Sequence, residues 1–236
     1  IGFSKYELPE ATVYIQNGAK YEDFTGLDSL IRQVEKFHEW KFLHNPEIFL
    51  FLDNESYWHR SFAKGLFVTY YDRIFVTPTA ISEASEGKIS MDIFLLHELS
   101  HSLIFQHLGF TKFNKFPKWL IEGIAVYSAN QMGTSIYPGK QETYKLIKQG
   151  YFLPPEIFRT NEEKKFNLSL DNKIGFLYSE FACIVDYMID SYGKEKFIVY
   201  LKQLCDNPDN NEVFRNVYGL GFETFIYNFR NHVDSE

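Results

Sequence analysis

Two histidines and a glutamate, His97, Glu98 and His101, lie within five consecutive positions of the chain. If this segment is helical, residues four apart lie on one face, so both imidazoles can bind one divalent metal ion. Glu98 lies about 100° further round the helix, where its carboxylate can hold a water on the open side of the metal. The His-Glu-x-x-His pattern is typical of zinc hydrolases. We therefore expect a Zn²⁺ site whose water is activated by Glu98.

The flanking residues predict the helix that this chemistry needs. Ser90 is a candidate N-cap, the apolar run 93–96 leads into the motif, and Gly109 is a C-terminal stop signal. Together they predict a helix over residues 91–108. Histidines and a glutamate would be costly to bury in so apolar a helix without partners, and a metal supplies one. The alternative is a helix that carries two core histidines and no metal.

Glu122 is the best candidate for a third ligand, since zinc hydrolases usually use three protein ligands and leave a fourth position for water. Pro117 suits the first turn of a second helix, and apolar residues flank Glu122 on both sides. The adjacent Gly123 has no side chain and would let this helix approach a neighbour closely. The alternatives for Glu122 are to cap a loop or to pair with Lys118.

With these residues the chain resembles the gluzincin metallopeptidases of the peptidase MA-like superfamily, whose catalytic domains are aminopeptidase-like or thermolysin-like. The likeness is His97-Glu98-x-x-His101 followed, after 20 intervening residues, by Trp119-Leu120-x-Glu122-Gly123-x-Ala125. In order and character it covers roughly residues 60 to 235. The resemblance implies a zinc-dependent peptidase with His97, His101 and Glu122 as metal ligands and Glu98 as general base.

A tyrosine near the start of a later helix extends the resemblance. By similarity, Tyr178 would donate its hydroxyl to the oxyanion that forms on the attacked carbonyl. A preorganised donor lowers the barrier because this charge appears only in the transition state. The chain has 16 tyrosines, and Tyr127 is the main alternative donor.

One departure from the aminopeptidase pattern bears on specificity. Aminopeptidases of this group carry a loop with glycine and glutamate, upstream of the zinc helix, that captures the free amino terminus of the substrate. Nothing in residues 65–90 matches that loop, and the acidic Glu83 and Glu86 belong to segment 82–87, which we interpret as a solvated loop. We therefore favour an endopeptidase.

Hydrophobic periodicity predicts an α+β fold, with a small mixed sheet and helices followed by a mostly helical part. The expected elements are a strand at 12–16, a helix at 27–42, a strand at 48–52, a hairpin of 65–71 and 73–77 turning near Asp72, and then helices at 140–149, 174–192, 194–205, 208–217 with Pro208 in its first turn, and 222–232. Segments 150–155 and 161–165 read as solvated connections.

These elements are expected to form a single zincin-like domain over residues 1–236. Residues 1–89 would be its α/β N-terminal portion, and residues 90–236 its helical portion with the zinc helix and the third ligand, so that the metal site lies between them. By resemblance, the strand Arg73–Thr77 would pair with an extended peptide substrate through its exposed edge. The alternative is a plain structural edge.

Composition limits the partners. A net charge of −7 argues against nucleic acid, and the sequence contains no apolar run long enough to cross a bilayer. We expect a soluble protein that acts on peptide or protein substrates. The start at Ile1 rather than methionine is consistent with removal of an N-terminal signal, which would place the protein outside the cell or in the cell envelope. The sequence leaves compartment and oligomeric state open.

Two other functions compete with peptide hydrolysis. One is a catalytically inactive zincin-fold module for binding or regulation, and the other is a zinc hydrolase of a non-peptide amide. The presence of Glu98 speaks against the first, since a protein without catalysis has no chemical need for a general base. The second shares all of the chemistry above, so only the substrate separates it from a peptidase.

Overall fold

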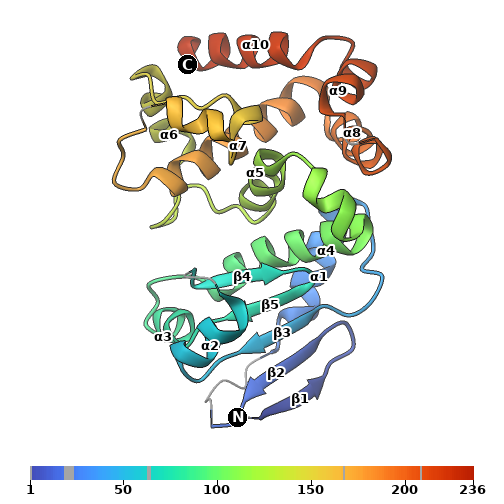
Figure 1. The fold of residues 1–236 in the computed structure, drawn as a ribbon, viewed down its shortest axis with the longest axis vertical. Coiled ribbons are helices and arrows are strands. Elements are labelled where there is room, and N and C mark those ends of the chain that lie inside the picture. The colour runs from blue at the N-terminus through green and yellow to red at the C-terminus, as the bar shows by residue number, and fades with distance from the viewer. Residues whose placement is uncertain (1, 19–23, 63–64, 167, 208) are drawn as a thin grey trace. The chain divides into compact units, whose positions relative to one another are not determined.

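The computed structural model describes residues 2–18, 24–62, 65–166, 168–207 and 209–236 (Figure 1). The chain divides into two compact units, Ile1–Phe110 and Thr111–Glu236. The first unit combines a sheet with helices and the second is helical, so the mixed architecture expected from the sequence is confirmed. No helix within the described ranges is both long and apolar enough to cross a membrane. Pro208, predicted in the first turn of a helix, lies outside the described residues.

The described part of the first unit contains a five-stranded mixed sheet with the order β1-β2-β3-β5-β4. The central strands β2, β3 and β5 are parallel, and β1 and β4 join the two edges in antiparallel orientation. The strands are β1 (Phe3–Glu7), β2 (Thr12–Gln16), β3 (Glu47–Leu50), β4 (Phe67–Tyr70) and β5 (Arg73–Val76).

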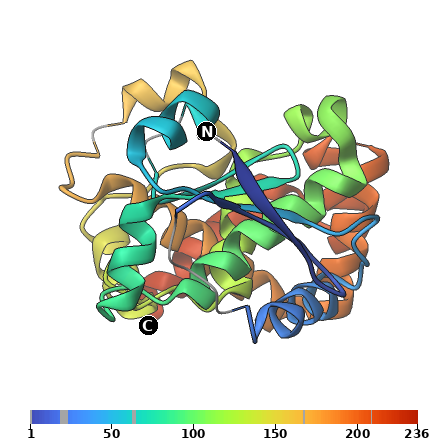
Figure 2. The same ribbon diagram turned by 90° about the horizontal axis from the view of Figure 1, so that it is seen from below.

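Helices cover both faces of this sheet, and in Figure 2 α1 (blue) and α2 (cyan) lie on opposite sides of the strands. They are α1 (Leu27–His38), α2 (Asn54–Ser61), α3 (Pro78–Ser85) and α4 (Met91–Lys115). Side chains of β2 and β3 line one cavity together with side chains of α1 and α4, so these two helices share a face. The opposite face carries an aromatic cluster in which Phe51 packs against both Phe75 and Tyr57 of α2.

Strand register decides which face Thr69 joins. Val13, Ile48 and Ile74 are paired across the sheet and buried, and Val13 and Ile48 line the cavity shared with α1 and α4. Thr69 of β4 pairs with Ile74. Because paired residues point to the same face of a sheet, Thr69 is directed toward the side that α4 covers.

The predicted hairpin is confirmed, but the role predicted for its second strand is wrong. β4 and β5 pair as an antiparallel hairpin through Tyr71 and Asp72. β5, however, lies between β3 and β4, so both of its edges are already paired. Arg73–Thr77 therefore has no unpaired edge with which to bind a substrate peptide, and the edge strand on this side of the sheet is β4. A hairpin pattern in the sequence does not show which of its two strands pairs with the rest of the sheet.

Two local predictions need correction, and two elements were not predicted. The helix expected over 27–42 ends at His38, because Glu39 adopts a left-handed conformation with φ 52°. Segment 82–87 is not a loop throughout, since its first four residues complete α3, whose N-cap Thr77 accepts a hydrogen bond from Ala80 N. The short strand β1 and the helix α2, capped by Asp53, were not expected from periodicity.

The second unit is a helical assembly arranged around α7 (Figure 1). Its elements are α5 (Lys118–Ser128), α6 (Lys140–Lys148), η1 (Pro155–Ile157), η2 (Asn161–Lys165), α7 (Lys173–Tyr192), α8 (Lys194–Asp206), α9 (Asn210–Tyr218) and α10 (Phe222–Ser235). The predicted helices agree with these bounds within a few residues.

A close approach of α5 to α7 fixes the centre of this unit. A Cβ atom on Gly123 would lie 2.7 Å from the carbonyl oxygen of Phe181 on α7. No side chain fits at that distance, which is the packing role expected for this glycine.

Candidate metal and catalytic site

The helix that carries the two histidines has the predicted bounds. Ser90 Oγ accepts a hydrogen bond from Ile93 N at 3.4 Å, as an N-cap does. At the other end Gly109 has φ 64° and ψ 173°, which interrupts the helical backbone of α4. The regular part of α4 therefore runs over the expected residues 91–108, and it holds both histidines one turn apart.

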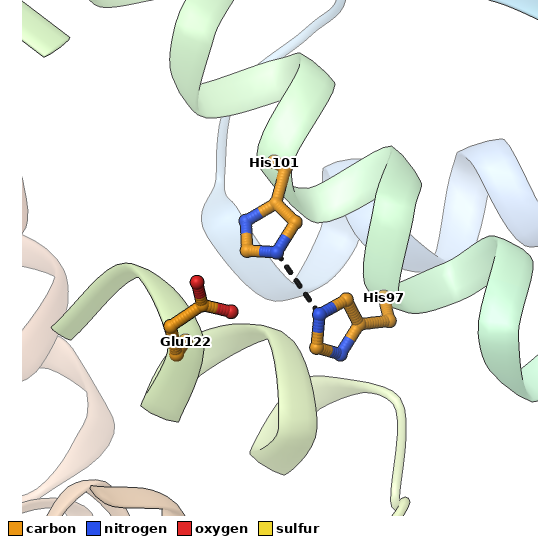
Figure 3. Close-up of side chains that lie close together, drawn as sticks. All are labelled: His97, His101 and Glu122. Carbon is orange, nitrogen blue, oxygen red and sulfur yellow. Dashed lines mark hydrogen bonds between the residues drawn. The ribbon is translucent and has the colours of Figure 1, made fainter. Parts of the chain in front are cut away.

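The three predicted ligands, His97, His101 and Glu122, lie close together (Figure 3). One ligand atom of each lies within 4.8 Å of those of the other two. The two histidine Nε2 atoms are 2.9 Å apart, and Figure 3 shows the Glu122 carboxylate directed toward the rings. Two imidazole nitrogens and one carboxylate oxygen form the donor set of many catalytic zinc sites.

Glu98, the predicted general base, is held by the edge strand. Thr69 Oγ1 lies 2.7 Å from Glu98 Oε2 and 3.0 Å from the backbone oxygen of the same residue. A hydroxyl has one proton, so Thr69 donates to one of these two acceptors at a time. The contact fixes one carboxylate oxygen and leaves Oε1 as the other proton acceptor. The sheet register described above is what brings Thr69 to this position.

Glu122 lies on α5, which begins at Lys118 directly after the helix-starting Pro117. Its side chain is 9% exposed and its carboxylate pairs with Arg159, whose Nη2 is 3.1 Å from Glu122 Oε1. Lys118, considered as a partner from the sequence, donates from Nζ to the carbonyl oxygen of Phe113 at 2.8 Å. Glu122 thus forms an ion pair with an arginine 37 residues further along the chain, and Lys118 also interacts with it electrostatically.

Tyr178 lies in the second turn of α7, which Asn172 caps by accepting from Gly175 N. Its hydroxyl oxygen accepts a hydrogen bond from Arg159 Nη2 at 2.8 Å. Burial raises the pKa of the Tyr178 hydroxyl, the negative charge of Glu122 raises it further, and the positive charge of Arg159 acts in the opposite direction. Tyr178 is thus a neutral proton donor near the third predicted ligand.

Tyr127, the alternative donor, has different electrostatic neighbours. It follows Glu122 by five residues on α5, about 140° round the helix. Burial raises the pKa of its hydroxyl, with further contributions from Asp186 and Asp190. Glu122 contributes to the raised pKa of Tyr178, whereas Asp186 and Asp190 contribute to that of Tyr127.

Comparison with known proteins agrees with the motif. The family model described as Peptidase MA superfamily matches residues 58–235, close to the extent of the resemblance seen in the sequence. The chain belongs to the Peptidase MA superfamily. No curated protein gives a significant match to the sequence.

Two solved structures share the fold of this superfamily member. One is the M1 zinc metallopeptidase from Deinococcus radiodurans, at 14% identity and a TM-score of 0.53, covering 97% of this chain and 50% of that one. The other is a glutamate-to-alanine mutant of an M1 zinc metallopeptidase from the same organism, at 13% identity and a TM-score of 0.55, covering 97% and 51%. This chain therefore spans about half the length of the structures it matches.

Two residues of the site were not found from the sequence. Thr69 is one of several threonines in strand-forming segments, and only the sheet register shows that it reaches Glu98. Arg159 lies between two short 3-10 helices in a stretch that reads as a connection. A positive φ of 60° marks this residue, but backbone conformation is not visible in sequence.

Proposed function

We propose that this chain is a zinc-dependent peptidase that hydrolyses peptide bonds, with His97, His101 and Glu122 as the metal ligands. The observation that carries the proposal is that one ligand atom of each of these residues lies within 4.8 Å of the other two. Two imidazoles and one carboxylate fit zinc in a hydrolase, because a fourth position stays open for water. Membership of the Peptidase MA superfamily supports the same assignment.

Bound by these residues, zinc would polarise the carbonyl and lower the pKa of water toward about 7. Glu98 then takes the proton of the attacking water and later passes it to the leaving amine, so that it acts as base and then as acid. Thr69 keeps Oε2 of Glu98 engaged during this exchange, which directs proton transfer to Oε1. Tyr178 donates its hydroxyl proton as a hydrogen bond to the developing oxyanion.

An endopeptidase fits the sequence better than an aminopeptidase. The stretch before the zinc helix lacks the glycine and glutamate loop that would capture a free amino terminus, and residues 78–85 of this stretch form α3. Since β5 is paired on both sides, β4 is the strand offered for main-chain pairing with an extended substrate. Peptides with free and with acetylated amino termini should therefore be cleaved at similar rates.

Zinc stoichiometry tests the ligand assignment. Wild type and the variants His101→Ala and His107→Ala are purified, loaded with zinc and measured by atomic absorption, and each is assayed against a peptide library. His107 is the matched control, because it lies on the same helix and contacts the backbone oxygen of Lys41. We expect one zinc in wild type and in His107→Ala, and loss of zinc and of cleavage in His101→Ala.

Equal zinc content in wild type and His101→Ala would refute the ligand assignment. A zinc-loaded wild type that cleaves no peptide of the library would instead favour a binding or regulatory module, or a hydrolase of another amide. Profiling with non-peptide amides then separates these two.

A further inference from the structure

Arg159 is built into the second unit by its backbone as well as by its side chain. It adopts φ 60°, a left-handed conformation that is unfavourable for residues other than glycine. Its backbone N donates to Glu163 Oε2 at 2.8 Å, and Lys173 Nζ lies 2.8 Å from the other oxygen of Glu163. Unfavourable backbone conformations persist only where surrounding contacts hold them, and here an ion pair from α7 supplies that hold.

The side chain of Arg159 joins the two site residues of the second unit. A single nitrogen, Nη2, lies 3.1 Å from Glu122 Oε1 and 2.8 Å from the hydroxyl oxygen of Tyr178. This nitrogen has two N–H bonds, so it can donate to both oxygens at once. Such hydrogen bonds are charge-assisted and stronger than those between neutral groups.

We propose that Arg159 is a positioning residue that sets the orientation of both Tyr178 and Glu122, an inference that rests on the proposed peptidase function. By donating to the phenol oxygen, Arg159 occupies an acceptor position of Tyr178, whose own proton is hydrogen-bonded to Glu122, and it thereby holds the hydroxyl beside the third predicted ligand. By donating to Oε1 of Glu122, it holds the carboxylate in one orientation. Contacts behind a metal ligand commonly orient it in this way.

These two contacts predict two separable effects. Loss of the contact to Tyr178 should lower kcat and leave KM nearly unchanged, because the oxyanion exists only in the transition state. Loss of the contact to Glu122 should weaken zinc binding about tenfold, within the range typical of partners behind metal ligands.

The experiment compares Arg159→Met, Arg159→Lys, Tyr178→Phe and the double variant Arg159→Met with Tyr178→Phe. Zinc affinity is measured by competition with a chromogenic chelator. The values of kcat and KM are measured with one peptide, supplied both as its C-terminal acid and as its C-terminal amide. Thermal unfolding shows whether each variant is folded. Arg215→Met, at an exposed position of α9, is the control and should match wild type.

We expect Arg159→Met to bind zinc about tenfold more weakly and to lose about tenfold in kcat. The double variant should lose little more kcat than Tyr178→Phe, since both substitutions remove one interaction. Arg159→Lys should recover part of both losses, because it keeps the charge but not the planar fork. Even if Arg159→Met fails to fold, Arg159→Lys still tests the proposal through a fall in zinc affinity and kcat.

If wild type is active and the folded Arg159 variants keep its zinc affinity and kcat, the positioning role of Arg159 is refuted and the proposed peptidase function is not. Additive losses of kcat in the double variant would also overturn it. A rise in KM for the peptide acid but not for the peptide amide would overturn it as well, because Arg159 would then be a substrate-binding residue. A wild type that binds zinc and cleaves nothing contradicts the proposed function instead. The zinc affinities of the Arg159 variants then still show whether Arg159 acts on Glu122.

Discussion

Two regions supply the predicted chemistry, and they are built on different principles. The histidine region, His97–His101 with Thr69, belongs to the first unit, and its motif residues lie on one helix within five positions. The carboxylate region consists of Glu122, Arg159 and Tyr178 of the second unit, with sequence separations of 37 and 19 residues. Helical periodicity places the motif residues of the first region, whereas packing between distant segments defines the second.

The two glutamates also have partners of different charge. Glu98 receives a hydrogen bond from the neutral hydroxyl of Thr69, and Glu122 pairs with the cationic Arg159. A nearby cation stabilises the ionised carboxylate, which suits a metal ligand that must stay deprotonated. A general base has to accept a proton in each turnover, and a neutral donor orients its carboxylate without adding a counter-charge. The difference in partners matches the difference in proposed roles.

Replacing Glu98 with Gln is the largest expected change, and it breaks the histidine region while sparing the carboxylate region. The variant keeps all three ligands but has no carboxylate to take the proton from water. We expect about 10²–10⁴-fold lower kcat with unchanged zinc content. Steady-state kinetics and atomic absorption on the same preparation measure both quantities. Turnover equal to that of wild type would refute the role of Glu98.

Gly123→Ala disturbs the carboxylate region through packing. The added Cβ would lie 2.7 Å from the Phe181 carbonyl oxygen, so α5 and α7 must move apart. Although alanine favours helices, we expect a loss of about 1–3 kcal/mol in the free energy of unfolding. The control is Gly221→Ala, whose Cβ would lie 4.0 Å from Thr224 Oγ1, the nearest atom found among the described residues. Chemical denaturation that shows equal stability for the two variants would contradict the packing argument.

The sequence predicts the helix of the histidine region well, though not Thr69, because the information for that helix is local. The N-cap at Ser90, the apolar run and the stop at Gly109 all act within one helix, and the structure shows the helix with those bounds. The sequence also predicts the roles of Glu122 and Gly123, since a lone acid in an apolar helix and an adjacent glycine both indicate a close neighbour.

What the sequence does not predict depends on long-range pairing. Whether β5 is an edge strand depends on β3, which precedes it by more than twenty residues. Thr69 reaches Glu98 only because of the sheet register, and Arg159 reaches Tyr178 only because a connecting segment folds back onto α7. Neither residue has a distinguishing neighbour in sequence, so periodicity and motif spacing carry no information about them.

Glu180→Gln sharpens the comparison by separating stability from chemistry near the carboxylate region. Glu180 is fully buried on α7 and accepts a hydrogen bond from Leu153 N at 3.3 Å. Within the described part of the chain its Oε1 has no partner. Burial raises the pKa of this carboxyl well above its ordinary value of 4.5. The folded state therefore holds its proton more tightly than the unfolded state does.

The sign of the pH effect follows from this difference. The contribution of Glu180 to stability is fully present below pH 4.5 and is lost as pH rises toward the pKa in the folded state. Glutamine does not titrate, so above pH 4.5 the free energy of unfolding of the variant should rise relative to that of wild type by up to about 1.4 kcal/mol per pH unit. Thermal unfolding between pH 4 and 8, with the exposed Glu223→Gln as control, measures the gain. A constant difference across this range would contradict the assignment.

Thr69→Val, paired with Thr69→Ser, tests the neutral partner of the base directly. Valine has nearly the same shape as threonine but cannot donate to Glu98 Oε2, now 2.7 Å from the hydroxyl. A hydrogen bond to a charged group contributes roughly 1.5–3 kcal/mol, so we expect kcat to fall about tenfold or more with KM and zinc content unchanged. Serine retains the hydroxyl and should restore most of the loss. If valine and serine behave alike, the orientation of Glu98 is set by the helix alone and the edge strand has no part in the proton transfer.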